Sequence, residues 1–247
     1  MAHLYDETYG RFADKYAVRQ YVADCGLDSL LVPVYEIWED PSEIDFSGLP
    51  AAFVLKATHG AGDRFREFVY DKDTADIDKI KEKFSKVFKY NYALKRGEYH
   101  YAGIKPRIIC EKMLMQPGHP FLNDFKIVCS YGKAKAVLVC SERNKGRDYY
   151  SCDWQYLEYV KPEYRSDHQH QKPAQLDEMI RVAEILSRPF PLARIDLYCV
   201  EDRIYMGEIT LTPYGGSHNY LTDYGQSELG KMISLPSKAA ARRYLEK

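Results

Sequence analysis

The pattern of apolar and polar positions along the chain predicts several helices. In each of them apolar residues recur at three- and four-residue spacing and line one face. Gly26 follows the first helix and Pro173 precedes the third, as is common at helix ends. The predicted ranges are 14–25, 76–90, 174–186 and a C-terminal helical tail over about 226–247.

Shorter apolar runs predict strands, and two of the runs turn back on themselves as hairpins. The ranges are 30–35, 51–57, 107–115, 124–143 with a turn at Gly132, and 192–211 with a turn at Glu201, Asp202 and Arg203. Residues 147–171 are rich in tyrosine and charge and predict a surface excursion. Helices mixed with hairpins indicate an α+β fold, with one lobe at about 30–110, a second at about 111–220, and a cleft between them.

Composition narrows the class of protein. The 247 residues are 45% apolar and 29% charged, which is typical of a globular chain, and the formal net charge of -1 argues against binding nucleic acid as the main task. The six cysteines are scattered without a Cys-x-x-Cys pair, which favours a reduced protein without a zinc site. The N-terminus lacks a signal-peptide pattern, and no run reaches the ~18 apolar residues that would span a membrane, so we expect a cytoplasmic protein.

Two of the candidate motifs lie in the first predicted lobe. Lys56 ends a buried strand ahead of the turn His59-Gly60-Ala61-Gly62, where glycines let backbone N–H groups approach a phosphate and the lysine supplies the opposite charge. Glu111 follows the apolar residues Ile108, Ile109 and Cys110 in the strand predicted at 107–115, where a carboxylate can accept from an adenine amine. Taken singly, each motif also fits an ordinary turn or an exposed strand end.

The other two motifs lie in the second predicted lobe. Asp124 and Lys126 share a strand face, as do Arg194 and Asp196, because residues two apart point the same way. The returning strand carries Glu208, followed two residues later by a threonine, so Asp196 and Glu208 are expected side by side. Two close carboxylates repel unless a cation lies between them, and their hard oxygens suit magnesium. Solvated charges on an open hairpin face are the simpler alternative.

In this order the motifs resemble the ATP-grasp superfamily, and D-alanine–D-alanine ligases provide the template. The matching residues are Asp14-Lys15, Lys56 with the turn at His59–Gly62, Glu111-Lys112-Met113-Leu114, Arg194-Ile195-Asp196, Glu208 and Pro213. The phrases FVLKATHGAGD, DFK and IYMGEITLTP resemble more closely the TupA-like branch, named for teichuronopeptide biosynthesis and associated with bacterial cell-surface polysaccharides. The resemblance covers about Asp14 to Gly216.

This resemblance implies an ATP-grasp fold, with ATP and magnesium bound in the cleft between two α+β lobes. The implied nucleotide-binding residues are Lys15, Lys56, His59, Gly60, Gly62, Glu111, Lys112, Leu114 and Asp124. The implied metal ligands are Asp196, Glu208 and Thr210, and the last stands where the ligases have asparagine. Arg194 is expected to stabilise an acyl phosphate, and Lys126 to contact phosphate or substrate. The loop at His59 is expected to act as a lid.

The implied reaction is ATP-dependent joining of a carboxylate to an amine, with a sugar acid or an amino acid as the natural acid. The main alternative is a phosphotransferase that uses the same site on a sugar hydroxyl. A nucleotide-binding module without activity and a glycosyltransferase are further alternatives. Only some thirteen residues precede Asp14, so a counterpart of the ligases' N-terminal substrate domain is not expected. A homodimer and a partner glycosyltransferase are both compatible with that arrangement, and His218 and Asn219 fit either an acceptor pocket or a plain turn.

Overall fold

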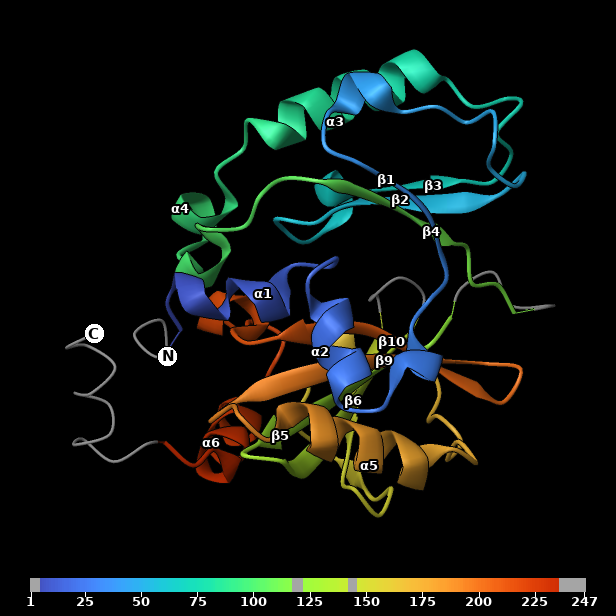
Figure 1. Cartoon of the computed structure of the whole chain (residues 1–247). Helices are drawn as coiled ribbons and strands as arrows, with labels where there is room; N and C mark the ends of the chain where they lie inside the picture. Colours follow the sequence, from blue (N-terminus) through green and yellow to red (C-terminus); the bar gives the residue numbers. More distant parts are fainter. Residues whose placement is uncertain (1–4, 117–121, 142–145, 236–247) are drawn as a thin grey trace.

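Two antiparallel sheets form the framework of the protein (Figure 1). The computed structural model describes residues 5–116, 122–141 and 146–235. One sheet has four strands in the order β1-β4-β2-β3, and the other has six in the order β10-β9-β5-β6-β7-β8. The strands are β1 Val34–Trp38, β2 Phe53–Ala57, β3 Arg66–Val69, β4 Ile108–Lys112, β5 Asp124–Ser130, β6 Lys133–Ser141, β7 Gly146–Tyr150, β8 Tyr156–Leu157, β9 Ala193–Val200 and β10 Arg203–Thr210. The helices are α1 Gly10–Ala13, α2 Val18–Asp24, α3 Ile77–Phe88, α4 Tyr92–Arg96, α5 Leu176–Ser187 and α6 Asp223–Met232.

Each sheet has a helix on the face that lies away from the other sheet (Figure 1). On the four-stranded sheet this helix is α3, whose Ile80, Phe84 and Val87 pack with Phe53 and Leu55 of β2. The α3 sequence places an apolar residue every three or four positions, so one face is buried and the other carries lysine and glutamate. The predicted α+β class is confirmed.

The six-stranded sheet is covered by α5 and by the N-terminal segment. Met179 and Leu186 of α5 share a core with Ile127 and Ile195 of the sheet. The alternation along β5, β9 and β10 turns one set of side chains into this core and the other set toward the four-stranded sheet. Among the described residues no helix is both long and apolar enough to cross a membrane.

The first described residues, from Tyr5 to the end of α2, contribute to the core of this second sheet. Val22 is fully buried there. The Tyr5 hydroxyl donates to the carbonyl of Leu192 and accepts from the Leu192 N–H at 3.2 Å, across 187 positions of sequence. Tyr21 donates to the carbonyl of Leu186 at 3.0 Å. The N-terminal segment therefore depends on β9 and α5 for its place.

Three expected elements differ in the structure. The first helix begins at Val18 and not at Asp14, because the Asp14 carboxylate accepts from the backbone N–H groups of Tyr16 and Ala17 and holds a turn there. The strand expected at 30–35 begins only at Val34. The boundary expected at 110/111 falls inside β4, which pairs throughout within the four-stranded sheet.

A further difference is the largest, because the predicted surface excursion at 147–171 contains β7 and β8 of the six-stranded sheet. Its Asp148, Tyr149 and Tyr150 are each only 2% exposed. The Asp148 carboxylate is satisfied by the Tyr156 hydroxyl and the Ser166 backbone N–H, each at 3.3 Å. At the C-terminus α6 is described, whereas residues 236–247 of the expected tail lie outside the described residues.

Candidate active site

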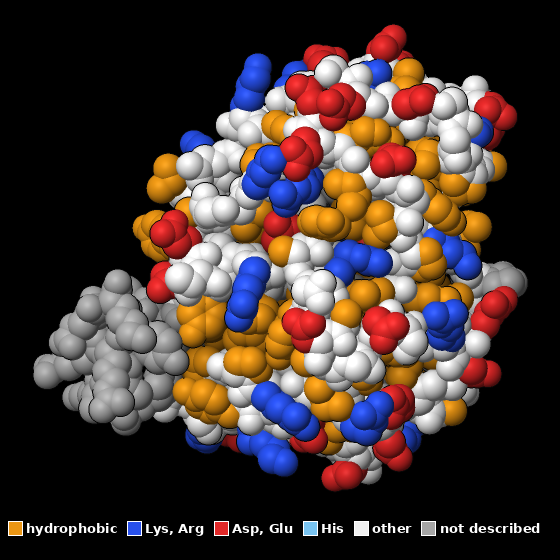
Figure 2. Space-filling view, in the orientation of Figure 1, with side chains coloured by type: hydrophobic (Ala, Val, Ile, Leu, Met, Phe, Trp, Pro, Cys, Tyr) orange, Lys and Arg blue, Asp and Glu red, His pale blue; other side chains and the backbone are white. Residues whose placement is uncertain are grey.

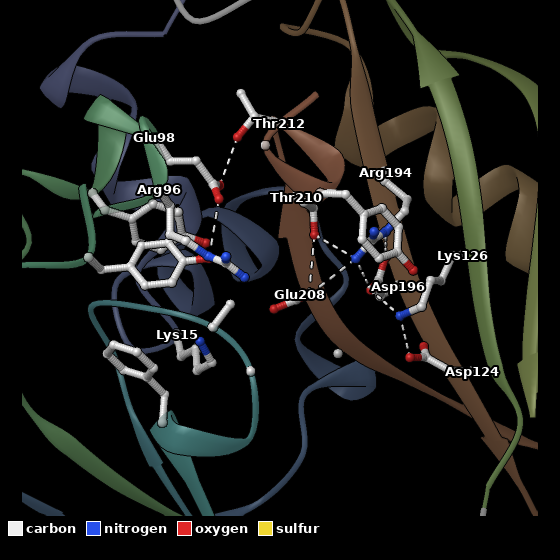
Figure 3. A pocket seen from close by; sticks show the side chains of 18 of the residues that line it. Lys15, Arg96, Glu98, Asp124, Lys126, Arg194, Asp196, Glu208, Thr210 and Thr212 are labelled. Carbon is white, nitrogen blue, oxygen red and sulfur yellow. Dashed lines mark hydrogen bonds and ion pairs between the residues drawn. The ribbon is translucent and has the colours of Figure 1, made fainter. Parts of the chain in front are cut away.

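A cavity of about 700 Å³ lies between the two sheets, and Figure 3 shows the side chains on both of its walls. Eight lysine or arginine side chains and four aspartate or glutamate side chains line it. On the face of the molecule drawn in Figure 2, charges of both signs are intermingled. Because cationic side chains outnumber anionic ones in its lining, the cavity has an excess of positive charge, although the whole chain has a net charge of -1. This excess favours an anionic ligand.

Strand pairing places the charged residues of one wall in a row. Asp196 of β9 lies opposite Glu208 of β10 on one side and opposite Lys126 of β5 on the other. An irregularity in the register between Met206 and Glu208 keeps Glu208 level with Asp196. The expected juxtaposition of Asp196 and Glu208 is thus present in the structure, while their role as metal ligands stays a prediction.

Arg194 joins this row into one buried ion cluster (Figure 3). Its Nε and a terminal nitrogen donate to the two carboxylate oxygens of Asp196 at 2.6 and 2.7 Å, and Lys126 Nζ donates to Asp196 at 2.6 Å and also to Asp124. Burial by itself would lower the pKa of Arg194 and of Lys126, but the adjacent carboxylates outweigh it and hold both pKa values well above their usual range. Burial raises the pKa of Asp196, and Arg194 and Lys126 oppose that rise.

Glu208 lies between this cluster and Lys15 on the opposite wall (Figure 3). Burial by itself would raise its pKa, but Lys15, Arg194 and Lys126 outweigh burial and lower the pKa of Glu208 to about 2. Arg194 donates to Glu208 at 3.3 Å, and the Thr210 hydroxyl accepts from Arg194 at 3.0 Å and donates to Glu208 at 3.2 Å. Glu208 is therefore ionised at neutral pH.

The opposite wall carries the two expected phosphate-binding lysines. Lys15 Nζ donates to the carbonyl of Gly60 at 2.5 Å, and Lys56 Nζ donates to Glu111 at 2.5 Å. Burial lowers the pKa of Lys15, and Glu208 opposes that change. Both lysines line the cavity, so the structure brings them together with the carboxylates of the second sheet.

The glycine turn is arranged differently from the expected lid. His59 is 5% exposed, its Nε2 is 3.1 Å from the carbonyl of Val87 in α3, and its ring lies outside the lining of the cavity. Burial lowers the pKa of His59. Gly60 also stays behind the lining, whereas Gly62 has φ +90° and lines the cavity. Of the turn, Ala61 and Gly62 face the cavity and His59 anchors the turn to α3.

Gly60 is needed for packing. A Cβ atom at this position would lie 2.3 Å from Cε1 of Phe65, a buried ring that also lines the cavity. We expect Gly60→Ala to lower the free energy of unfolding by about 1–3 kcal/mol, as overpacking does. Gly48→Ala is the matched control, because Gly48 is exposed and nothing lies within 4 Å of its Cβ position. Equal urea midpoints for the two variants would contradict this explanation.

The residues expected to hold adenine do not line this cavity. Glu111 bonds to Lys56, which lines it, and Leu114 packs in an apolar cluster with Val32 and Tyr198, of which Tyr198 lines it. Lys112 is exposed at the end of β4. Glu111 and Leu114 therefore border the cavity through a neighbour, and the adenine-binding role of all three residues stays a prediction.

The acidic residues suit a magnesium ion that a nucleotide helps to hold. Among the described residues, the bonds of Glu208 all end on Oε1, and Asp124 Oδ1 is buried without a hydrogen-bond partner. No group of three or more His, Cys, Asp or Glu within the described ranges is placed to hold a metal by itself. Magnesium commonly binds one or two carboxylates together with phosphate oxygens, so these oxygens fit the ion.

Several cavity residues had no signal in the sequence. Arg96 is the last residue of α4, Glu98 lies in the turn after it, and Arg147 comes from β7. Glu98 accepts from the Thr212 hydroxyl at 2.8 Å and from the Tyr92 hydroxyl at 3.2 Å, and burial raises its pKa. Asn219 also lines the cavity, whereas His218 lines a smaller one beside it. These residues meet only through the tertiary fold, and no spacing along the chain relates them.

Comparison with known proteins agrees with this geometry. The sequence model of a family described as TupA-like ATP-grasp matches residues 4–234. No functionally curated protein matches the chain. The match to the family therefore spans both sheets and every residue of the cavity.

Solved structures show the same fold at low sequence identity. The D-alanine–D-alanine ligase from Bacillus anthracis complexed with ATP is 15% identical, with a TM-score of 0.54 over 96% of this chain and 67% of that one. The L-amino acid ligase from Bacillus licheniformis is 17% identical, with a TM-score of 0.53 over 93% and 51%. The ADP complex of purK, N5-carboxyaminoimidazole ribonucleotide synthetase, is 14% identical, with a TM-score of 0.54 over 90% and 50%. The chain thus spans between half and two thirds of these proteins, and the predicted ATP-grasp fold is confirmed.

Proposed function

Because the chain belongs to the TupA-like ATP-grasp family and is an ATP-grasp ligase, we propose that it joins a carboxylic acid to an amine through an acyl phosphate. The observation that carries the proposal is the buried cluster of Arg194, Asp196 and Lys126 with the partly buried Glu208 beside it, which faces Lys15 across a positively charged cavity. Such a cavity suits both the triphosphate of ATP and the anionic acid.

In the proposed reaction the acid carboxylate attacks the γ-phosphorus of ATP, and the bond to the β–γ bridging oxygen breaks to release ADP. The amine then attacks the acyl carbon, phosphate leaves, and the amine gives up a proton. Lys15 and Lys56 bind the phosphates, and Arg194 and Lys126 hold the acid and the anionic intermediate in place. Magnesium held by Asp196 and Glu208 would supply charge neutralisation at the phosphates when bound.

We further propose that the acid is a sugar acid or an amino acid used in bacterial cell-surface polysaccharide synthesis. The support is the TupA-like character of the family, together with a cavity that leaves room beside the ion cluster for a second substrate. The amine substrate can be presented by a partner protein. This partner would be a second copy of the chain or a glycosyltransferase.

Phosphate release from magnesium-ATP against a panel of uronic and amino acids tests the reaction. Each acid is assayed with and without hydroxylamine, which traps an acyl phosphate as a hydroxamate. Acid-dependent phosphate together with hydroxamate is the expected result. Formation of ADP without free phosphate would instead establish a phosphotransferase, and tight ATP binding without turnover would contradict an activity of the chain alone.

A further inference from the structure

Arg147 reaches the cavity from β7, a strand that carries no part of the ion cluster. In the six-stranded sheet Arg147 lies opposite Cys140, which in turn lies opposite Asp124. Residues in one such row point to the same face, so Arg147 shares the face of Asp124. It lies two strands away, or about 10 Å along the sheet. The positive wall thus extends well past the cluster around Asp196.

The guanidinium of Arg147 has no anionic partner among the residues that the structure describes. Its Nε is buried without a hydrogen-bond partner, and no carboxylate of the described residues pairs with it. By contrast, Arg194 and Lys126 on the same face are both neutralised by carboxylates. A buried donor without a partner lowers stability, and a ligand that accepts from it removes that cost. Arg147 is therefore suited to bind an anionic group of a ligand.

Two tyrosines connect Arg147 to the ion cluster. The Arg147 Cζ atom lies 5.0 Å from the Tyr220 ring centroid, and the Arg194 Cζ atom lies 5.5 Å from that of Tyr214. The two rings pack edge to face at 5.2 Å. Tyr214 is 39% exposed and lines the cavity. Two packed tyrosine rings therefore connect Arg194 with Arg147, and of these rings Tyr214 lines the cavity while Tyr220 is buried behind it.

We propose that Arg147 binds a second anionic group of the acid substrate, a phosphate or a carboxylate, while the carboxylate to be activated lies at Arg194. This inference rests on the proposed function, because it assigns the two arginines to two ends of one acid. It names the substrate class as acids with two separated negative charges. Arg147, Arg194 and the ring of Tyr214 line the same cavity, so one ligand that lies along Tyr214 can reach both guanidiniums.

The test is calorimetric binding of three acids in the presence of magnesium and a non-hydrolysable ATP analogue. Glucuronate carries one negative charge, glucarate adds a second carboxylate, and glucuronate 1-phosphate adds a phosphate. We expect one of the two polyanionic acids to bind about 10- to 100-fold more tightly than glucuronate, the range for a hydrogen bond to a charged group. The acid that binds more tightly, glucarate or glucuronate 1-phosphate, shows whether the second group is a carboxylate or a phosphate.

In Arg147→Gln the ratio of the affinity for the polyanionic acid to the affinity for glucuronate is expected to fall to near one. Arg203→Gln is the matched control, because Arg203 lies 5.0 Å over the Tyr205 ring but outside the cavity lining. This control should keep the ratio of the unmodified protein. Arg147→Lys, which keeps a charge but not the planar fork, should keep part of the ratio and serves if the glutamine variant fails to fold.

Three results would overturn the inference. One is equal binding of all three acids, and another is a ratio that persists in Arg147→Gln. The third is an Arg147→Gln variant that loses affinity for the ATP analogue instead, which would assign Arg147 to the nucleotide. Binding is measured without turnover, so an inactive protein would refute the proposed reaction and leave the result on Arg147 readable.

Discussion

Glu208→Gln is expected to lower acid-dependent phosphate release about a thousandfold while the protein stays folded. The side chain keeps its shape, and an amide oxygen can still accept from Arg194 and Thr210 at the position of Oε1. What disappears is a negative charge that persists at all ordinary pH values, because the pKa of Glu208 is about 2. Removing one preorganised electrostatic group from an active site commonly costs 10²–10³ in rate, and here a proposed metal ligand is lost with it.

The assay compares phosphate release by Glu208→Gln and by Glu178→Gln at saturating magnesium-ATP. Glu178 pairs with Arg181 on the exposed face of α5, so its variant loses a carboxylate of the same kind without touching the cavity. Retention of more than a tenth of the activity in Glu208→Gln would contradict the role proposed for Glu208.

Arg194→Leu is expected to lower the free energy of unfolding by about 3–5 kcal/mol and to abolish activity. Arg194 is 6% exposed and supplies two of the three charged hydrogen bonds that the Asp196 carboxylate accepts. Without it, Asp196 remains buried with Lys126 as its one charged donor. Breaking a buried ion pair from one side is costly because the remaining charge is not compensated.

Urea unfolding of Arg194→Leu, Asp196→Leu and the double variant measures this coupling. The double variant should be more stable than the sum of the two single losses predicts, because neither charge is left alone. Lys86→Leu is the control for losing an ion pair at the surface, since Lys86 pairs with Glu82 on exposed α3 positions, and it should cost less than ~0.5 kcal/mol. Additive losses would show that Arg194 and Asp196 are not coupled.

The composition of the cavity wall formed by β9 and β10 could be predicted from the sequence, because its residues lie close together along the chain. In the hairpin of β9 and β10 the polar residues Arg194, Asp196, Glu208 and Thr210 alternate with apolar ones, and a short polar turn joins the strands. The alternation indicates which residues share a face, and the turn indicates that the two strands pair. The regular register from the turn would place Gly207 opposite Asp196, and the irregularity between Met206 and Glu208 brings Glu208 there instead.

The wall formed by β7 could not be predicted in this way. Arg147, Asp148 and the two tyrosines after them have the composition of a surface loop. Asp148 is nevertheless buried, because Tyr156, Ser166 and His170 surround its carboxylate. A buried aspartate is stable only when such partners are present, and these partners are contributed by later residues whose positions depend on the complete fold.

The attachment of the N-terminal segment to the second sheet also has a consequence for synthesis on the ribosome. Tyr5 and Leu192 are separated by 187 positions, so at ~5–20 residues per second Tyr5 waits roughly 10–40 s for its partner to be made. During this interval β9 and β10, which share a core with α2, have not been made, so the apolar side chains of α2 are incompletely covered and accessible to chaperones. The segment around Tyr5 therefore completes its folding only after β9 has been made, and substitutions near Tyr5 should reduce yield in cells more than they reduce activity per folded molecule.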